Sequence, residues 1–257
     1  MLKQRIARGD ILIGSFAFLG SPDVVEILAL AGMDYVIIDT EHSPKDWGMI
    51  QHMIRAANLH DLPVLIRVAE NAEKLILQCL EIGADGIVLP FVQDAADAER
   101  AARASFYPPM GERGTCTVTR MTGYGARRAT FLDHCRAEND RLVLVAQVED
   151  RKGIDNIDAI IAAPPGIDAV LVGRSDLAAS FGHPGNVEAG EVLAATDRVI
   201  DAVASAARPV AIAMGIYTHD EVVRWKAKGC TVFFAPSDGL LMYNAARSWL
   251  HSLKGSE

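Results

Sequence analysis

Short apolar runs rich in Val, Ile and Leu alternate along this chain with longer amphipathic stretches. Apolar runs of about four to eight residues are typical of strands buried on both faces of a parallel sheet. We expect strands at Ile11–Phe16, Tyr35–Asp39, Val64–Arg67, Gly86–Pro90, Leu142–Glu149, Asp168–Gly173, Val210–Ala213 and Thr231–Ala235. Repeated βα units of this kind predict an α/β protein with a (β/α)8 TIM barrel.

Most segments between these runs have helical periodicity. We expect helices at Pro22–Ala31, Lys45–Asn58, Ala72–Ile82, Asp94–Ala104, Asp150–Ile161, Val187–Ala207, His219–Lys228 and Asp238–Leu253. Thr218 stands where an N-cap residue is favoured. Gly32, Gly83 and Gly229 each fall between a helix and the next strand, where a left-handed residue is expected.

One long segment, Ser105–Arg141, departs from this rhythm. It contains YPPMGERGTCTVTRMTGYG and a short helix expected at Ala126–Glu138. Long insertions in compact domains are usually lids or binding loops. The length of 257 residues suits one barrel better than two small domains, so we expect residues 1–257 to form a single catalytic domain.

The first residues have some features of a secretory signal, because Lys3, Arg5 and Arg8 precede the apolar run Ile11 to Leu19. However, Asp10 interrupts the positive charge, no small-residue cleavage site follows, and the run is too short to span a membrane. A first strand is therefore expected.

Composition narrows the possible partners. The formal net charge of −8 and the pI near 5.4 disfavour nucleic acid, which is usually bound by a concentrated basic face. The four cysteines, at positions 79, 116, 135 and 230, form no CxxC pair, so neither a zinc knuckle nor a disulfide framework is indicated. We expect a cytoplasmic protein with no membrane partner.

Polar residues gather where the expected strands end. In a parallel barrel the carboxyl ends of the strands and the loops after them build the active site. The residues at these ends are Asp39, Glu41 and His42 after the second strand, Arg67 on the third, Gln147 and Glu149 on the fifth, Asp176 after the sixth and Asp238 after the eighth.

Glu149 and Asp176 come from adjacent strand ends. Two carboxylates with room for water and substrate oxygens suit a hard cation such as Mg2+ or Mn2+. Spacing alone leaves an alternative open, in which these residues form ion pairs or Asp176 caps a helix.

His42 and Arg67 are candidates for proton transfer and anion binding. Histidine is the usual residue for proton transfer near neutral pH, and His42 can be oriented by Asp39 or Glu41, although a single histidine is often structural. Arg67 ends an apolar strand, where a guanidinium needs an anion, either a substrate oxygen or an internal partner such as Glu41 or Glu149.

The turn Gly173-Arg174-Ser175-Asp176-Leu177 leads into a possible helix start, whose free N–H groups can bind a small carboxylate. Alone, this signal is weak. A Schiff-base mechanism needs a desolvated lysine at a strand end, and none of the expected strands contains lysine.

Several segments together resemble the HpcH/HpaI family of class II pyruvate aldolases, which includes 4-hydroxy-2-oxoheptanedioate and 2-dehydro-3-deoxy-sugar-acid aldolases. They are IIDTEHSP, PVLIRV, GADGIVLPFVQ, YPPMGERG, QVEDRKGIDNID and VGRSDLAASFGHPGN. The resemblance runs from about Gly14 to Asp238. It implies a barrel that uses Mg2+, Mn2+ or Co2+ and cleaves a 4-hydroxy-2-oxo acid to pyruvate and an aldehyde. It also implies a homo-oligomer, often a hexamer built from dimers.

The resemblance also implies roles for single residues. Glu149 and Asp176 would bind the metal, His42 would be the acid–base group, Arg67 would hold the pyruvate oxygens, and Gln147, Gly173, Arg174 and Ser175 would line the pyruvate site. The family pairs its histidine with an acidic residue near the glycine of GA, here Glu81. Since Glu81 is expected at the opposite end of the barrel from His42, it would act from a neighbouring subunit.

Three departures from the family pattern concern substrate range and loop motion. Arg174 stands where proline is usual, Thr115-Cys116-Thr117 replaces small residues, and Pro236 stands where glycine is frequent.

Two other functions are considered. A CoA-ester lyase of the citrate or malyl-CoA type would need a cationic nucleotide-binding surface, which this acidic chain does not indicate, and a non-catalytic binding barrel would not need the motif residues.

Overall fold

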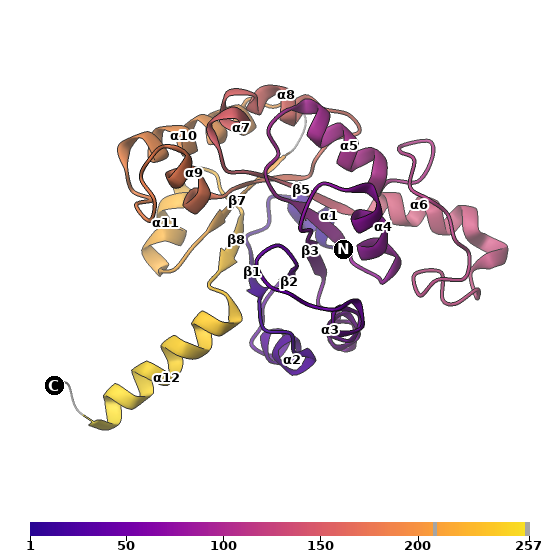
Figure 1. The fold of residues 1–257 in the computed structure, drawn as a ribbon, viewed down its shortest axis with the longest axis horizontal. Helices are drawn as coiled ribbons and strands as arrows, with labels where there is room; N and C mark the ends of the chain where they lie inside the picture. The colour runs from indigo at the N-terminus through magenta and orange to yellow at the C-terminus, as the bar shows by residue number, and fades with distance from the viewer. Residues whose placement is uncertain (208–209, 255–257) are drawn as a thin grey trace.

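A closed barrel of eight parallel strands forms the centre of the computed structural model, which describes residues 1–207 and 210–254 (Figure 1). Each strand pairs with its neighbours in sequence, and β8 pairs with β1. The strands are β1 (Leu12–Ala17), β2 (Tyr35–Asp39), β3 (Val64–Arg67), β4 (Gly86–Leu89), β5 (Val143–Val148), β6 (Ala169–Val172), β7 (Ala211–Gly215) and β8 (Val232–Ala235). The predicted (β/α)8 barrel is confirmed; residues 208–209 and 255–257 of the expected domain lie outside the described residues.

Helices follow the strands. They are α2 (Pro22–Leu30), α3 (Trp47–Leu59), α4 (Glu73–Glu81), α5 (Ala95–Ser105), α6 (Phe131–Arg141), α7 (Arg151–Asp155), α8 (Ile157–Ala162), α9 (Arg174–Ser180), α10 (Gly190–Ala204), α11 (His219–Ala227) and α12 (Asp238–Lys254), after a short α1 (Leu2–Ala7) that precedes the barrel. The expected single helix over 150–161 is wrong, because Asn156 separates α7 from α8. The expected helices at 126–138 and 187–207 begin too early, since α6 begins at Phe131 and α10 at Gly190.

The expected N-cap residue and the three expected left-handed glycines are confirmed. Thr218 accepts a hydrogen bond from Glu221 N, and the Glu221 side chain returns to the cap in a capping box. Gly32, Gly83 and Gly229 have φ of +89°, +104° and +93°. These left-handed turns let the chain reverse from helix to strand at no side-chain cost.

The run after the basic N-terminal residues is strand β1, as expected. Leu2 and Ile6 of α1 are buried in the same cluster as the barrel interior, so α1 covers the amino ends of the strands. Lys3 Nζ lies 3.1 Å from Asp168, just before β6. A basic residue near the N-terminus thus takes part in packing the base of the barrel.

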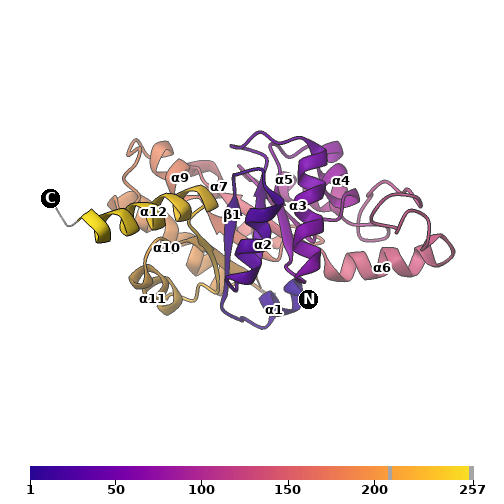
Figure 2. The same ribbon diagram turned by 90° about the horizontal axis from the view of Figure 1, so that it is seen from below.

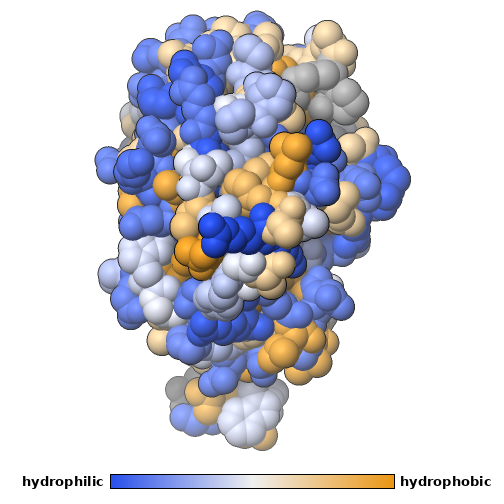
Figure 3. Space-filling model, turned by 90° about the vertical axis from the view of Figure 1, so that its right-hand side faces the viewer, coloured by the Kyte–Doolittle hydropathy of each residue, from blue (hydrophilic) through white to orange (hydrophobic). Residues whose placement is uncertain are grey.

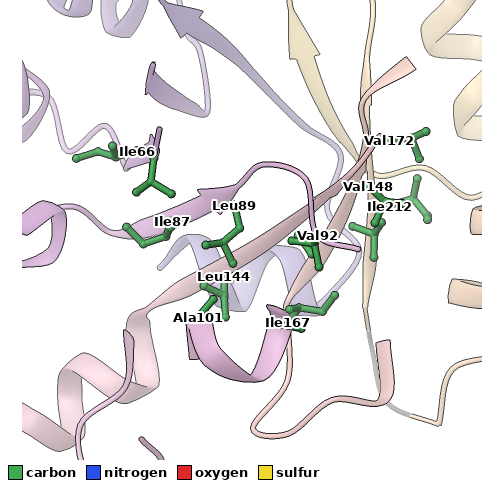
Figure 4. Close-up of a cluster of buried hydrophobic side chains, with 14 of the residues drawn as sticks. Ile66, Ile87, Leu89, Val92, Ala101, Leu144, Val148, Ile167, Val172 and Ile212 are labelled. Carbon is green, nitrogen blue, oxygen red and sulfur yellow. The ribbon is translucent and has the colours of Figure 1, made fainter. Parts of the chain in front are cut away.

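Side chains of the strands form two apolar layers. Those pointing inward, such as Ile37, Val145 and Phe234, fill the barrel. Those pointing outward pack against the helices, and Figure 4 shows part of this layer, where Leu89 of β4 and Leu144 of β5 lie near Ala101 of α5. Alternation along each strand produces both layers and fixes its register.

Two segments lie outside this compact arrangement. Figure 2 shows α6 and the loop before it at one end of the molecule and α12 at the other, where α12 extends away from the barrel. The side carrying the insertion is mostly hydrophilic, with separate hydrophobic patches (Figure 3). Within residues 1–207 and 210–254, no helix has the length and apolar character needed to cross a membrane.

Candidate active site

A cavity of about 460 Å³ lies at the carboxyl ends of the strands, within the size range of small-molecule sites. Eight of the nine expected site residues line this cavity: His42, Arg67, Gln147, Glu149, Gly173, Arg174, Ser175 and Asp176. Glu81 is not among them. The convergence follows from the parallel barrel, which brings the ends of β2, β3, β5 and β6 to one face.

Glu149 follows β5 and is 1% exposed. Its Oε1 accepts a hydrogen bond from Phe91 N at 2.8 Å, and its Oε2 accepts one from Gln147 Nε2. Burial raises the pKa of Glu149 to about 7, aided by the charges of Glu41 and Asp176, while the two hydrogen bonds oppose the rise. This carboxylate is poorly solvated and has a strong requirement for a positive partner.

Gly173 is required by the close approach of Glu149. A Cβ at position 173 would lie 2.5 Å from Glu149 Oε2, so any larger residue would displace that carboxylate. The sequence indicated a glycine turn here but not this reason for it.

Asp176 lies in the first turn of α9, two residues after the helix begins. The N-cap position is Gly173, where no side chain caps the helix. The alternative in which Asp176 is the helix cap is therefore wrong. Its side chain lines the cavity and adds negative charge near both Glu149 and Glu41.

Phe91 is a candidate site residue that the sequence did not reveal. It follows Pro90 and has φ of +48°, an unusual conformation for a bulky residue. In this conformation its N–H points to Glu149. Strained residues of this kind cluster at functional sites. In the sequence, Phe91 belongs to the LPFVQ part of the family resemblance, but this segment does not show that Phe91 has a positive φ.

Arg67 connects the cavity to two acidic residues. Its Nε lies 2.6 Å from Asp39 Oδ1 and 3.2 Å from Glu41 Oε2, and its guanidinium stacks over Phe16 at 4.7 Å. The ion pair with Glu41, which the sequence left open as an alternative to substrate binding, exists, and Asp39 is a further partner. Because Arg67 also lines the cavity, it combines internal pairing with access to a ligand.

His42 lies at the cavity rim, with a side chain that is 57% exposed. Its backbone N–H donates to Asp39 Oδ2 at 2.9 Å, and its Nε2 lies 3.7 Å from Glu41 Oε2. Asp39 therefore fixes the main chain of His42, while Glu41 is the acidic residue beside its ring. Burial is the main cause of the raised pKa of Glu41.

The donor set suits a hard cation held by few protein ligands. Across the described parts of the chain, no group of three or more His, Cys, Asp or Glu side chains is arranged to hold a metal. Mg2+ commonly takes only one or two carboxylates and completes its shell with water and substrate oxygens. Glu149 and Asp176 match that pattern, and the buried Gln147 Oε1 beside them has no hydrogen-bond partner among the described residues.

Two expected site residues are engaged elsewhere. Arg174 is 7% exposed and donates hydrogen bonds to Glu188 at 3.0 Å and to Glu221 at 3.3 Å. Glu81 ends α4, at the amino end of the barrel, where its Oε1 accepts from Arg113 Nη2 at 3.3 Å. Within one chain, Glu81 and His42 are therefore at opposite ends, as expected.

Asp238 supports the site without lining its cavity. It is 5% exposed, and its oxygens accept hydrogen bonds from Phe18 N at 3.0 Å and Leu19 N at 2.9 Å. It thereby ties the loop after β1 to the start of α12. Phe18 and Leu240, which the sequence did not indicate, both line the cavity.

Several known proteins with a similar sequence are named as aldolases, and a similar structure at 27% identity and a TM-score of 0.88 is that of the citrate synthase SbnG, which covers 98% of this chain and 97% of that chain. The chain is 34% identical to the hydroxypyruvate/pyruvate aldolase of Paraburkholderia phytofirmans, over 98% of this chain and 97% of that protein. It is 32% identical to the 5-keto-4-deoxy-D-glucarate aldolase of an Enterobacter species, over 98% and 96%. An HpcH/HpaI aldolase/citrate lyase family structure from Burkholderia cenocepacia superposes with a TM-score of 0.92 at 31% identity, covering 99% of both chains.

The family comparison agrees with these relatives. Residues 12–245 match the HpcH/HpaI aldolase/citrate lyase family, which is nearly the whole barrel. The expected resemblance is confirmed, as is the expectation of an enzyme that acts on carbon–carbon bonds. The chain belongs to the HpcH/HpaI aldolase/citrate lyase family.

Proposed function

We propose that this protein is a metal-dependent class II aldolase that reversibly cleaves a 4-hydroxy-2-oxo acid to pyruvate and an aldehyde. The observation that carries the proposal is the convergence of Glu149 and Asp176 with Arg67 and His42 in one cavity. The names of the relatives, pyruvate aldolases and a sugar-acid aldolase, support the same reaction class.

Glu149 and Asp176 would hold a divalent cation, Mg2+, Mn2+ or Co2+, which supplies positive charge to the carboxylate and keto oxygens of the 2-oxo acid. Arg67 would donate hydrogen bonds to the same end of the substrate. Gln147 and the turn of Gly173, Arg174 and Ser175 would form the walls around pyruvate.

His42 would move the proton. Its ring is exposed to the cavity rim, where it would accept the proton of the C4 hydroxyl, directly or through water, as the C3–C4 bond breaks. The bond electrons then remain on pyruvate as its enolate, which is protonated at C3. In the reverse direction the enolate attacks the aldehyde carbon.

A coupled assay of pyruvate release from a panel of 4-hydroxy-2-oxo acids tests the proposal. Turnover should be lost in EDTA and restored by Mg2+, Mn2+ or Co2+. Glu149→Gln and Asp176→Asn should each lower kcat/KM by about 100-fold or more, because each removes one of only two charged ligands. Full turnover in EDTA, or in a well-folded Glu149→Gln variant, would contradict the metal assignment.

The same samples address the CoA-ester lyase alternative. That function would be favoured if no 4-hydroxy-2-oxo acid is cleaved but a CoA ester is. A rise in the melting temperature of the protein with CoA would also favour it. A protein that binds pyruvate but turns over neither class of substrate would be a binding barrel.

We also propose that the active form is a homo-oligomer in the cytoplasm. One face of α12 carries five apolar side chains that the described part of the chain leaves exposed: Met242, Tyr243, Trp249, Leu250 and Leu253. A helix with such an unpaired apolar face favours a second copy of the chain as its partner. Glu81, acting from a neighbouring subunit, would then complete a site.

A further inference from the structure

The side of the cavity opposite Arg67 differs chemically from the rest of the site. In the closed barrel, β7 lies diametrically across from β3, which carries Arg67. Glu149 and Asp176 follow β5 and β6, so pyruvate occupies the side of the cavity between β2 and β6 in the proposed reaction. The remaining space, toward β7, β8 and β1, is where the aldehyde half must lie.

Apolar groups form most of this remaining space. Phe16 also lies under the Arg67 guanidinium at 4.7 Å, so it marks the border with the pyruvate side. Beyond it, Phe234 stacks on Phe16 with ring centroids 5.5 Å apart, and Phe18 lies 5.7 Å from Phe16. Pro236 and Leu240 continue the wall. Such a surface binds an uncharged substituent by excluding water and penalises a carboxylate, which loses hydration without gaining a partner.

Arg174 is the one cation on the β6–β7 side among the described residues that line the cavity. Its charge is already compensated. Nη1 lies 3.0 Å from Glu188 Oε1, Nη2 lies 3.3 Å from Glu221 Oε1, and the guanidinium packs over the fully buried Trp225 at 5.0 Å. Glu188 is shared with Arg224, whose Nη1 lies 2.8 Å from Glu188 Oε2. Two carboxylates and an aromatic face still leave the Arg174 guanidinium little capacity to bind a third anion.

The partners of Arg174 also hold the cavity wall. Glu221 Oε2 accepts hydrogen bonds from Tyr217 N at 2.7 Å and Thr218 N at 3.0 Å, which fixes the loop after β7. Glu188 follows Val187, and both Val187 and Tyr217 line the cavity. Arg174 therefore connects two wall segments to the turn that carries Asp176.

We propose that this chain selects an uncharged aldehyde, with Arg174 as a positioning residue whose charge is neutralised by Glu188 and Glu221. This inference rests on the proposed aldolase function. It narrows the second substrate to aldehydes without a carboxylate, and it places Arg174 where the turn beside pyruvate meets the wall of the acceptor site.

The test measures aldol addition of pyruvate to aldehydes of equal chain length, with and without a carboxylate: butanal against succinic semialdehyde, and acetaldehyde against glyoxylate. The wild-type kcat/KM should favour the uncharged member of each pair by about 10-fold or more. Exchange of the pyruvate C3 protons in D2O, which needs no aldehyde, reports the proposed function separately. Absence of exchange would refute the aldolase function, whereas exchange with the opposite aldehyde preference would refute only the selectivity.

A double variant tests the neutralised charge. Glu188→Gln with Glu221→Gln keeps the side-chain shapes and the capping box while releasing Arg174 from both carboxylates. The relative kcat/KM for the carboxylate-bearing aldehydes should rise about 10-fold, with an unchanged rate of pyruvate proton exchange. Glu191→Gln with Asp220→Asn is the control, because it removes the same charge from neighbouring positions. An equal rise in the control would overturn the proposal.

Arg174→Met separates the two possible roles of the arginine. A positioning role predicts a raised KM for the aldehyde, with Arg174→Lys recovering part of the loss. If Arg174 instead binds a substrate carboxylate, the wild type will prefer succinic semialdehyde and glyoxylate, and Arg174→Met will abolish that preference alone. That result would refute the inference.

Discussion

Glu149 concentrates the chemistry of the site in one buried carboxylate. Its side chain has two hydrogen bonds, yet burial outweighs them and raises its pKa to about 7. Gly173 gives Oε2 the space to lie against the turn after β6, and the strained Phe91 supplies an N–H to Oε1. These contacts orient the carboxylate while leaving its charge unpaired, which is the arrangement expected of a ligand for a cation.

The raised pKa of Glu149 predicts how the stability of the metal-free protein depends on pH. Because its folded-state pKa of about 7 exceeds the ordinary value of 4.5, the folded state holds the proton more tightly. The associated stability is fully present below about pH 4.5 and is lost as the pH rises through 7. In EDTA, the free energy of unfolding in urea should fall by about 2–3 kcal/mol between pH 5 and pH 8 from this group alone.

Two variants separate the contribution of Glu149 to the pH dependence of stability from that of other titrating groups. Glu149→Gln should remove the fall, whereas Glu99→Gln, at an exposed position on α5, should retain it. Added Mg2+ should stabilise the wild type more at pH 8 than at pH 6, since proton and cation compete for the same oxygens. The same pH slope in wild type and Glu149→Gln would contradict the buried, unpaired carboxylate.

Among single residues, the sequence predicted those whose role follows from strand-end position. Arg67, Glu149 and Asp176 were predicted because parallel strands bring their carboxyl ends together. The backbone N–H of Phe91 was not, since φ is set by packing around the LPF segment. Likewise, the pairing of Arg174 with Glu188 joins residues whose proximity depends on loop conformation.

At the level of elements, α12 is the exception to a regular pattern. Apart from α6 in the insertion, the other helices pack on the barrel, but α12 extends outward between α11 and α2 (Figures 1 and 2). Exposed apolar side chains also occur on the helices that flank this position, at Ile27 and Leu30 of α2 and at Val223 of α11. Both surfaces expose apolar side chains, so in the proposed oligomer an exchange of α12 between two copies would bring them together.

Substitutions on the apolar face of α12 test this pairing. Trp249→Glu with Leu253→Glu should convert the oligomer to smaller species at micromolar concentration, measured by size exclusion with light scattering, because two buried charges would oppose association. Asn244→Glu with His251→Glu places the same charges on the opposite face of the helix and should leave the assembly intact. A monomeric wild type would contradict the exchange.

The strands and their limits were largely predictable, whereas the limits of several helices were not. All eight strands were expected within two residues at each end, because apolar runs between amphipathic segments are a strong signal. The break at Asn156 and the short α1 were missed, since segments of five or six residues carry little periodicity. The packing partner of α12 could not be predicted either. An amphipathic pattern indicates that one face of a helix is covered, but it does not identify the covering segment.

For the whole molecule, the question is whether one chain completes its own site. Glu81 lies at the amino end of the barrel, and His42 lies at the carboxyl end. Glu81 has only Arg113 as an ionic partner in the described residues, and its buried Oε2 accepts no hydrogen bond there. A residue so placed contributes to catalysis only if a neighbouring subunit brings the two ends of different barrels together.

Mixing two inactive variants distinguishes a role across subunits from a local one. Glu81→Gln and Glu149→Gln should each be inactive alone, whereas co-refolded mixtures should recover about one quarter of wild-type turnover, because random assembly joins the two intact residues at one site in four. In each recovered site, Glu149 comes from one chain and Glu81 comes from the neighbouring chain. If Glu81 only anchors Arg113 in the insertion, Glu81→Gln will be less stable to heat and no mixture will recover activity. Recovery that disappears when Trp249→Glu and Leu253→Glu are added would show that the α12 contact is needed to assemble the shared site.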